Sequence, residues 1–150
     1  MEREVGPPPA EMVDTRFPAT PEAVARQIDA VAAIVADHSD CHGLRSDLAI
    51  VLGEVLNNIV EHSVGAGGDG CIGLTVRTRH ASLLVETIDR GRPLPPRLLT
   101  HAALPEMGGG IPDLPEGGFG WFIIHSLARD MMYERDAGAN RLSFRLDASV

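Results

Sequence analysis

The chain has 150 residues, which suits one domain with its own hydrophobic core. Its formal net charge of −8 argues against a nucleic-acid backbone as partner, because such binding depends on clustered lysine and arginine side chains. No apolar run approaches the roughly 20 residues of a membrane span, and the N-terminus has no signal-peptide pattern. The sequence therefore predicts a cytoplasmic protein without direct nucleic-acid or membrane partners. Cys41 and Cys71 show no disulfide or zinc pattern and are expected to be small, buried or half-buried residues.

The N-terminal part of the chain is predicted to contain a short strand and a helix. Residues 1–13, which include three consecutive prolines, are expected to form a flexible lead-in. Residues 15–19 are predicted to be an edge strand, because Pro18 lacks the N–H group that a central strand needs. Thr20 suits a helix N-cap and Pro21 the first helical position, and valine and isoleucine residues at helical spacing follow.

The most strongly patterned stretch, residues 44–63, is predicted to be a helix packed on the core. At about 100° per residue, its apolar side chains cover one broad arc. Glu54 and Asn58 lie one turn apart at the edge of the polar arc, whereas Asn57 points elsewhere, so only Asn58 shares a site with Glu54. Gly53 and the two asparagines are poor helix formers, which favours a functional interpretation. The alternative is a surface helix whose polar side chains are simply solvated.

A β-hairpin and a long loop are predicted after this helix. Residues 72–76 and 82–88 alternate apolar and polar types, and the second strand places Asp89 at its end on the core-facing side. Residues 91–117 are rich in proline and glycine and have no periodicity. A structureless stretch of this length is typical of a lid or binding loop.

The C-terminal part is predicted to contain a helix over residues 121–128 and a second hairpin. The hairpin strands cover residues 131–134 and 141–146, with a turn over residues 138–140 between them. The order of elements indicates a two-layer α/β sandwich, with helices on one face of a mixed, mostly antiparallel sheet.

Three polar features of these elements suit a magnesium-nucleotide site. A glycine-rich turn before a helix, here Gly118-Phe119-Gly120, offers unpaired N–H groups and the positive end of the helix dipole to phosphates. The Asn58 side chain offers a neutral oxygen suited to Mg²⁺, and Glu54 could remove a proton from an attacking hydroxyl or water. A buried Asp89 could accept a hydrogen bond from an amino group such as that of adenine. Alternatively, the glycines only punctuate a loop, and Asp89 only caps the turn at Gly91.

The combined pattern resembles the N, G1 and G2 boxes of the GHKL ATPases, which share the Bergerat fold; the matching residues are Glu54, Asn58 and His62, then Asp89 and Gly91, then Gly118 and Gly120. The resemblance covers nearly the whole chain and implies one ATP-binding domain over residues 14–148, with a lid at about residues 91–117. Residues 54–62, 116–124 and 133–135 look like those of RsbW-type anti-sigma factor serine/threonine kinases.

This resemblance implies a role for each matching position. Asn58 would bind Mg²⁺, and Glu54 would be the general base. Asp89 would hold the adenine amino group, with Gly91 giving close approach. The cofactor-binding residues of the G2 box would face the phosphates and comprise Gly118, Phe119 and Gly120.

Relatives of the RsbW type use ATP to phosphorylate a serine of a STAS-domain anti-anti-sigma protein, sequester a sigma factor, and are commonly homodimers. The resemblance therefore implies a protein kinase that uses Mg-ATP and also acts as an anti-sigma factor. The alternative is an ATP-binding anti-sigma or regulatory module without kinase activity, which would not need Glu54 as a base. A third interpretation is an α/β domain that binds no nucleotide.

Three features near the motifs are interpreted with more restraint. Pro93 stands where many relatives in the wider superfamily have glycine, and its ring stiffens the turn, so nucleotide affinity or lid motion could differ. His62 suits a packed, hydrogen-bonded histidine better than a catalyst. Arg92 and Arg97 are better explained as solvated loop charges than as phosphate ligands.

Overall fold

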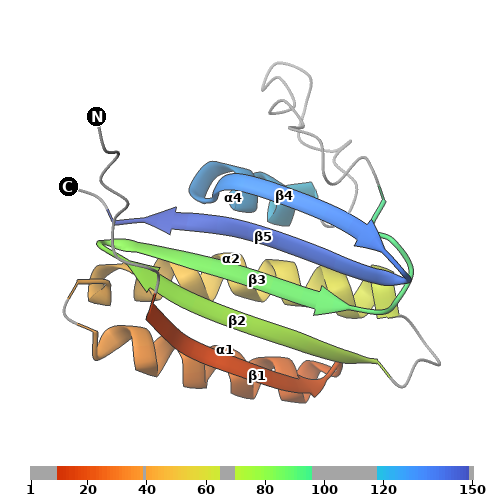
Figure 1. The fold of residues 1–150 in the computed structure, drawn as a ribbon, viewed down its shortest axis with the longest axis horizontal. Coiled ribbons are helices and arrows are strands. Elements are labelled where there is room, and N and C mark those ends of the chain that lie inside the picture. Colours follow the sequence, from red (N-terminus) through yellow and green to blue (C-terminus); the bar gives the residue numbers. More distant parts are fainter. Residues whose placement is uncertain (1–9, 39, 65–69, 96–117, 149–150) are drawn as a thin grey trace, which may run out of the picture.

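The protein forms a two-layer α/β sandwich in the computed structural model, which describes residues 10–38, 40–64, 70–95 and 118–148 (Figure 1). This arrangement confirms the predicted fold class. In chain order the elements are β1 (Ala10–Pro18), α1 (Pro21–Ala36), the 3₁₀ helix η1 (His42–Leu44), α2 (Arg45–Asn58), the π-helix η2 (Ile59–Val64), β2 (Cys71–Arg79), β3 (Ser82–Asp89), α4 (Gly118–Leu127), β4 (Arg129–Asp136) and β5 (Ala139–Asp147).

The sheet has five strands in the order β1-β2-β3-β5-β4. Every pairing between these strands is antiparallel, so the described part of the sheet contains no parallel pair. Strand β3 lies at the centre, between β2 and β5, while β1 and β4 form the two edges. Pro18 ends the edge strand β1, which agrees with its lack of an N–H donor.

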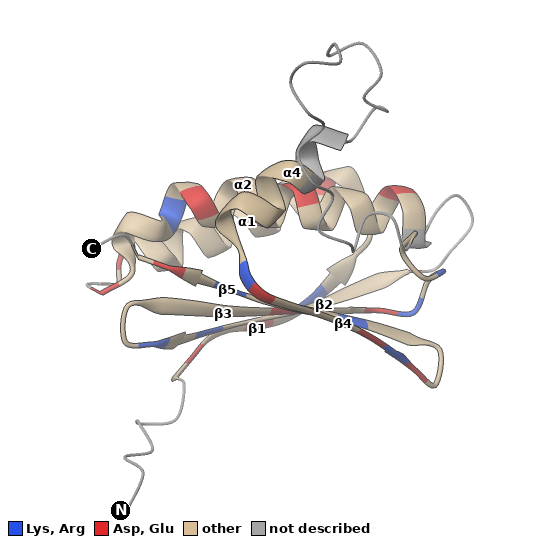
Figure 2. Ribbon diagram, turned by 90° about the horizontal axis from the view of Figure 1, so that it is seen from above, with Lys and Arg blue, Asp and Glu red and all other residues tan. Residues whose placement is uncertain are grey.

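The three longer helices lie on one side of the sheet, as Figure 2 shows. Alternate residues of β2, β3 and β5 point toward this helical layer and are buried. The apolar arc predicted for α2 is confirmed, because five of its side chains are at most 1% exposed: Leu48, Val51, Leu52, Val55 and Leu56. The core therefore lies between this helix and the sheet.

The predicted elements are present, and the two largest differences from the predicted boundaries lie at the start of β1 and at the end of α2. Among the smaller ones, α4 begins at Gly118 rather than at residue 121, and β5 begins at Ala139, inside the predicted turn. Strand β1 begins at Ala10 rather than Thr15, because its first residues pair with the far end of β2 beyond a bulge between Glu11 and Val13. Helix α1 begins as predicted, with the Thr20 hydroxyl accepting a hydrogen bond from the N–H of Ala23 at 3.2 Å. The second difference lies at the end of α2.

Helix α2 was predicted to continue to Ser63, but the α-helix ends at Asn58 and the chain continues as η2. The side-chain Nδ2 of Asn58 donates to the backbone oxygen of Glu54 at 2.7 Å. Regular α-helical geometry assigns this oxygen to the backbone N–H of Asn58, so the side chain competes with the backbone there. This competition gives a local reason for the change of helix type.

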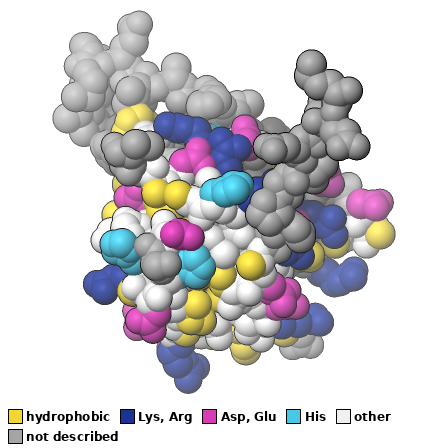
Figure 3. All heavy atoms as spheres, turned by 60° about the vertical axis from the view of Figure 1, so that its left-hand side comes forward, with side chains coloured by type: hydrophobic (Ala, Val, Ile, Leu, Met, Phe, Trp, Pro, Cys, Tyr) yellow, Lys and Arg dark blue, Asp and Glu magenta, His cyan; other side chains and the backbone are white. Residues whose placement is uncertain are grey.

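The surface of the described residues carries charges of both signs and a few exposed large hydrophobic side chains, namely Ile34, Ile50 and Met132. On the face seen in Figure 3, basic, acidic and histidine side chains are interspersed. No helix in the described part of the chain is long and apolar enough to cross a membrane. Cys41 is buried and Cys71 is half-buried, as predicted, and both are free thiols.

Candidate functional site

The end of α2 contributes Glu54 and Asn58 to the candidate site. Asn58 is only 7% exposed, whereas Asn57 is exposed, which confirms that the two asparagines face different environments. The hydrogen bond from Asn58 to the Glu54 carbonyl orients the side-chain amide. Its oxygen, Oδ1, is consequently turned away from this carbonyl and is the atom that suits a cation. The Glu54 side chain is half-buried on the preceding turn of the same helix.

The end of β3 contributes Asp89, which is 3% exposed and faces the helical layer as predicted. Its Oδ1 accepts hydrogen bonds from the N–H of Gly91 and from Nδ2 of Asn140, both at 2.9 Å. The capping interpretation of Asp89 is therefore correct, and the same carboxylate is also buried beside a second donor. Two donors on one oxygen hold this buried carboxylate in a fixed orientation.

Asn140, the residue opposite Asp89 in the β3–β5 register, was missed as a site residue. It is 1% exposed and bonds to Asp89 across the sheet, whereas the sequence interpretation treated it only as part of a turn. A usable signal existed, because strand alternation places Asn140 on the same face as Leu142 and Phe144. A polar side chain on a core-facing position needs a buried partner.

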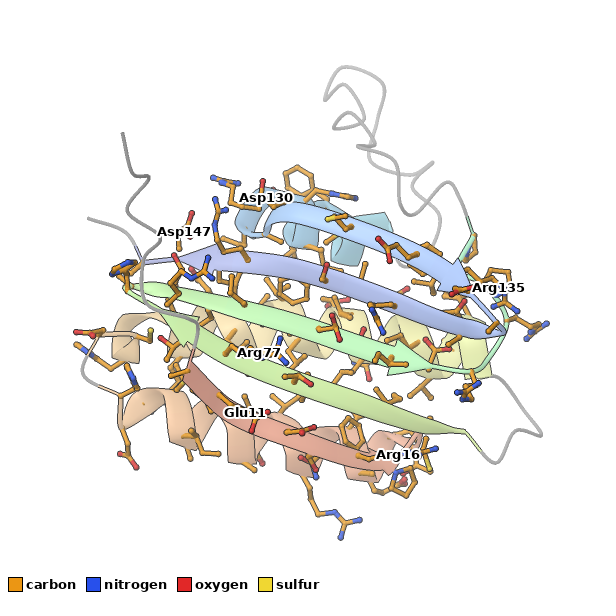
Figure 4. The ribbon with its side chains drawn as sticks, in the orientation of Figure 1. Glu11, Arg16, Arg77, Asp130, Arg135 and Asp147 are labelled. Carbon is orange, nitrogen blue, oxygen red and sulfur yellow. The ribbon has the colours of Figure 1, made fainter. Side chains whose placement is uncertain are left out.

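Two side chains of β4 extend this network to the segment that follows Asp89. The hydroxyl of Tyr133 accepts from the N–H of Leu94 and donates to Oδ1 of Asn140, both at 3.0 Å. Arg135 donates from Nη1 to the Gly91 carbonyl at 3.0 Å and to Oδ1 of Asn140 at 2.6 Å. Figure 4 shows Arg135 at this end of the sheet. The β4–β5 hairpin therefore holds the first residues after Asp89.

Thr87 is the remaining buried polar residue at this end of β3. It is 1% exposed and, two residues before Asp89, shares its helix-facing side. Its hydroxyl has no hydrogen-bond partner within the described residues. An unpartnered buried hydroxyl is unfavourable unless a water or a ligand satisfies it. Thr87 and Asp89 therefore present an unsatisfied hydroxyl and an oriented carboxylate on one face.

The fold brings these elements together. Strand β3 packs against η2, which begins directly after Asn58, and α4 packs against α2. Gly118, Phe119 and Gly120 form the first turn of α4, so the predicted glycine-rich helix start is present. Residues 96–117, which hold most of the predicted lid, lie outside the described part of the structure. His62 is one-third exposed, and its Nε2 lies 3.9 Å from the exposed Glu61 carboxylate.

The sequence matches the histidine kinase-like ATPase domain over residues 17–146. The chain belongs to this histidine kinase-like ATPase family. Such a match covers all the described elements that carry the candidate site. No curated protein matches the sequence.

Two solved structures share the fold of this histidine kinase-like ATPase domain. The RsbU and RsbW domains of Rv1364c from Mycobacterium tuberculosis align with a TM-score of 0.58 and 15% identity, covering 90% of this chain and 32% of that chain. The nucleotide-free catalytic domain of histidine kinase ThkA aligns with a TM-score of 0.51 and 16% identity, covering 91% of this chain and 96% of that chain. The chain thus spans about a third of the first structure. At these identities the likeness establishes the fold alone.

Membership of an ATPase family implies ATP binding, and the residues of the site fit that ligand. The oriented carboxylate of Asp89 and the unpartnered hydroxyl of Thr87 suit a polar nucleobase edge. No group of three or more His, Cys, Asp or Glu side chains in the described ranges could hold a metal ion. A Mg²⁺ ion bound through Asn58 would therefore need oxygen ligands from nucleotide phosphates and water, which is its usual coordination beside nucleotides.

Proposed function

We propose that this histidine kinase-like ATPase domain is an ATP-dependent serine protein kinase and anti-sigma factor of a bacterial partner-switching system. Its substrate would be a STAS-domain anti-anti-sigma protein, and it would sequester a sigma factor. The observation that carries the proposal is the pairing on α2 of a half-buried carboxylate, Glu54, with a buried and oriented amide, Asn58. The fold shared with a structure that contains an RsbW domain supports this assignment.

Bound Mg-ATP would supply the phosphoryl group to be transferred. Asn58 would hold the metal through Oδ1, and Asp89 would accept from the adenine amino group. Gly91 has no Cβ and would therefore allow the nucleobase to approach closely, while its N–H bonds to the Asp89 carboxylate. The first turn of α4, Gly118, Phe119 and Gly120, would direct its N–H groups toward the phosphates.

Glu54 would act as the general base. Its half-buried carboxylate lies on the helical turn before Asn58, so the base and the metal ligand belong to one rigid element. The carboxylate would take the proton of the partner's serine hydroxyl as that oxygen bonds to the γ-phosphorus, while the bond from this phosphorus to the β–γ bridging oxygen breaks and ADP leaves. The assembly that the resemblance supports is a homodimer in the cytoplasm.

A second candidate function is an ATP-binding regulatory module without kinase activity. The orientation of Asn58 depends on the backbone carbonyl of Glu54 and not on its carboxylate. Nucleotide binding is therefore compatible with the loss of the general base. Only the kinase function needs the Glu54 carboxylate.

The decisive experiment is incubation with Mg-ATP and a candidate STAS-domain protein, with phosphate transfer followed by mass spectrometry. We expect transfer to a serine, and a loss of at least about 100-fold in Glu54→Gln, which is the usual size of a general-base effect. Glu61→Gln is the matched control, since Glu61 is an exposed carboxylate on η2. ATP affinity of each variant is measured by calorimetry.

The outcomes distinguish the candidate functions. Transfer that survives Glu54→Gln would remove Glu54 from the role of base. Tight ATP binding without transfer to any STAS-domain protein would favour the regulatory module. Absence of ATP binding by the unsubstituted protein would overturn both assignments.

A further inference from the structure

The hydrogen bonds around Asn140 form a chain in which every bond runs in the same donor-to-acceptor direction. It starts at the backbone N–H of Leu94, which can only donate and bonds to the Tyr133 hydroxyl oxygen at 3.0 Å. The Tyr133 hydroxyl then donates its own hydrogen to Oδ1 of Asn140. The Nδ2 of Asn140 donates in turn to Asp89. Each bond in this chain fixes the direction of the next one.

Arg135 independently fixes the same orientation of the Asn140 amide. A guanidinium has five N–H donors and no acceptor, so its 2.6 Å contact with Asn140 must be made to the amide oxygen. With Oδ1 facing two donors, Nδ2 faces Asp89 Oδ1 and the carbonyls of Gly91 and Arg92, at 2.9, 3.0 and 3.1 Å. A flipped amide would place its oxygen against the Asp89 carboxylate, where the two acceptors would repel.

This arrangement determines what Asp89 can recognise. The Asp89 carboxylate receives hydrogen bonds from Asn140 and Gly91, and these hold it in one orientation as an acceptor. An oxygen that is held as an acceptor requires a donor on the ligand. It therefore favours a base edge that carries an amino group over an edge that carries a keto oxygen or only hydrogen at the same place.

We propose that Tyr133, Arg135 and Asn140 are positioning residues for nucleobase recognition, so that the β4–β5 hairpin helps to select the amino group of adenine. The inference rests on the proposed function, because it takes Asp89 as the group that meets the base. It adds residues of the β4–β5 hairpin that lie outside the N, G1 and G2 boxes. Arg135 is exposed on the edge strand β4, so its removal need not disturb the core.

The test compares two ligands in each variant. Calorimetry measures the dissociation constants of ATP and of purine riboside triphosphate, which lacks only the 6-amino group, at constant Mg²⁺. The unsubstituted protein should prefer ATP. Arg135→Met and Tyr133→Phe each remove one of the two donors to Asn140 Oδ1 and should each lower this preference about 3- to 10-fold, with little change for the analogue.

Arg141→Met is the matched control, because it removes an arginine next to Asn140 in the same hairpin. The Arg141 side chain lies near Glu86, 3.8 Å away, and has no contact with Asn140 among the described interactions. Its preference for ATP should stay unchanged. If Arg135→Met and Tyr133→Phe weaken both ligands equally, the network is purely structural and the inference is wrong.

Failure of the proposed function gives a different pattern. If the unsubstituted protein binds ATP and the analogue equally well, Asp89 does not read the amino group, and the proposed role of Asp89 falls together with this inference. If it binds neither ligand, nucleotide binding itself is refuted. If the unsubstituted protein prefers ATP and Arg135→Met and Tyr133→Phe keep that preference, the positioning role is rejected while the proposed role of Asp89 stands.

Discussion

The β3–β5 ladder has an aspartate at each end, and the two aspartates lie in opposite environments. At one end Asp147 pairs with Ser82, and at the other Asp89 pairs with Asn140. Asp147 is exposed and bonds to the Ser82 hydroxyl at 2.7 Å and to Arg145 at 2.8 Å. Asp89 is 3% exposed and bonds to groups that are themselves held in place. In Figure 4, Asp147 and Arg135 mark these two ends of the sheet.

The comparison extends to two buried threonines on the helix-facing side. Near the Asp147 end, the Thr78 hydroxyl is 3.2 Å from the Cys41 sulfur and is therefore satisfied. Near the Asp89 end, the Thr87 hydroxyl has no partner in the part of the chain that the structure describes. The buried threonine at one end is thus satisfied within the chain, whereas the one at the other end leaves a hydroxyl that a water or a ligand could satisfy.

The largest effect should come from the buried end of the ladder. Asn140→Leu should lower the free energy of unfolding by about 2–4 kcal/mol, because it removes the amide that donates to the buried Asp89 carboxylate and to the carbonyls of Gly91 and Arg92. Urea denaturation measures this change. Asp147→Asn is the matched substitution at the exposed end and should cost less than about 1 kcal/mol. Equal losses in the two variants would mean that burial does not separate the two ends.

Substitution of the two buried threonines should change the free energy of unfolding by a smaller amount, and in opposite directions. Thr87→Val removes an unpartnered buried hydroxyl and should raise the unfolding free energy of the nucleotide-free protein by about 1 kcal/mol. Thr78→Val removes the partner of the Cys41 thiol and should lower it by about 1 kcal/mol. Thermal unfolding without nucleotide compares the two nearly isosteric substitutions. Destabilisation in both would show that Thr87 has an intramolecular partner.

The smallest effect should be the pH dependence of the stability that Asp147 contributes at the exposed end of the ladder. Hydrogen bonds from the Arg145 guanidinium and the Ser82 hydroxyl lower the pKa of Asp147 below its ordinary value of 3.8. A lowered pKa in the folded state gives stability that is present above the ordinary pKa and is lost as the pH falls through the folded value. The stability difference between the unsubstituted protein and Asp147→Asn should therefore shrink below about pH 4.

Salt provides the control for this prediction. An exposed ion pair is screened, so 1 M sodium chloride should reduce the same difference at neutral pH. A difference that stays constant from neutral to acidic pH would contradict the assigned pKa shift. Denaturation curves collected across this pH range measure both effects.

The parts of the site that depend on local periodicity could be predicted from the sequence. The two-residue repeat of β3 placed Asp89 on the core side, and the helical repeat of α2 separated Asn58 from Asn57. Both patterns are confirmed, because they require only the geometry of one element. The alternation signal of the last hairpin was also present, but Asn140 was hidden in a segment interpreted as a turn.

The parts that depend on pairing between distant segments could not be predicted in the same way. Asp89 and Asn140 are 51 residues apart, and their contact requires the β3–β5 register, which no local pattern specifies. Likewise, β1 begins earlier than predicted because it pairs with the whole length of β2. The end of α2 depends on one side-chain bond to the Glu54 carbonyl, which residue propensities do not reveal.

The position of β5 has a consequence for the order in which the sheet assembles during synthesis. This strand is the last described element in sequence, yet it lies between β3 and β4 in the sheet. During synthesis, β3 and β4 therefore emerge before β5, the strand that pairs with both of them. Asp89 meets Asn140 of β5, so a nascent chain that lacks β5 cannot form this buried pair. If Asp89 has the proposed role, nucleotide should stabilise only the completed sheet.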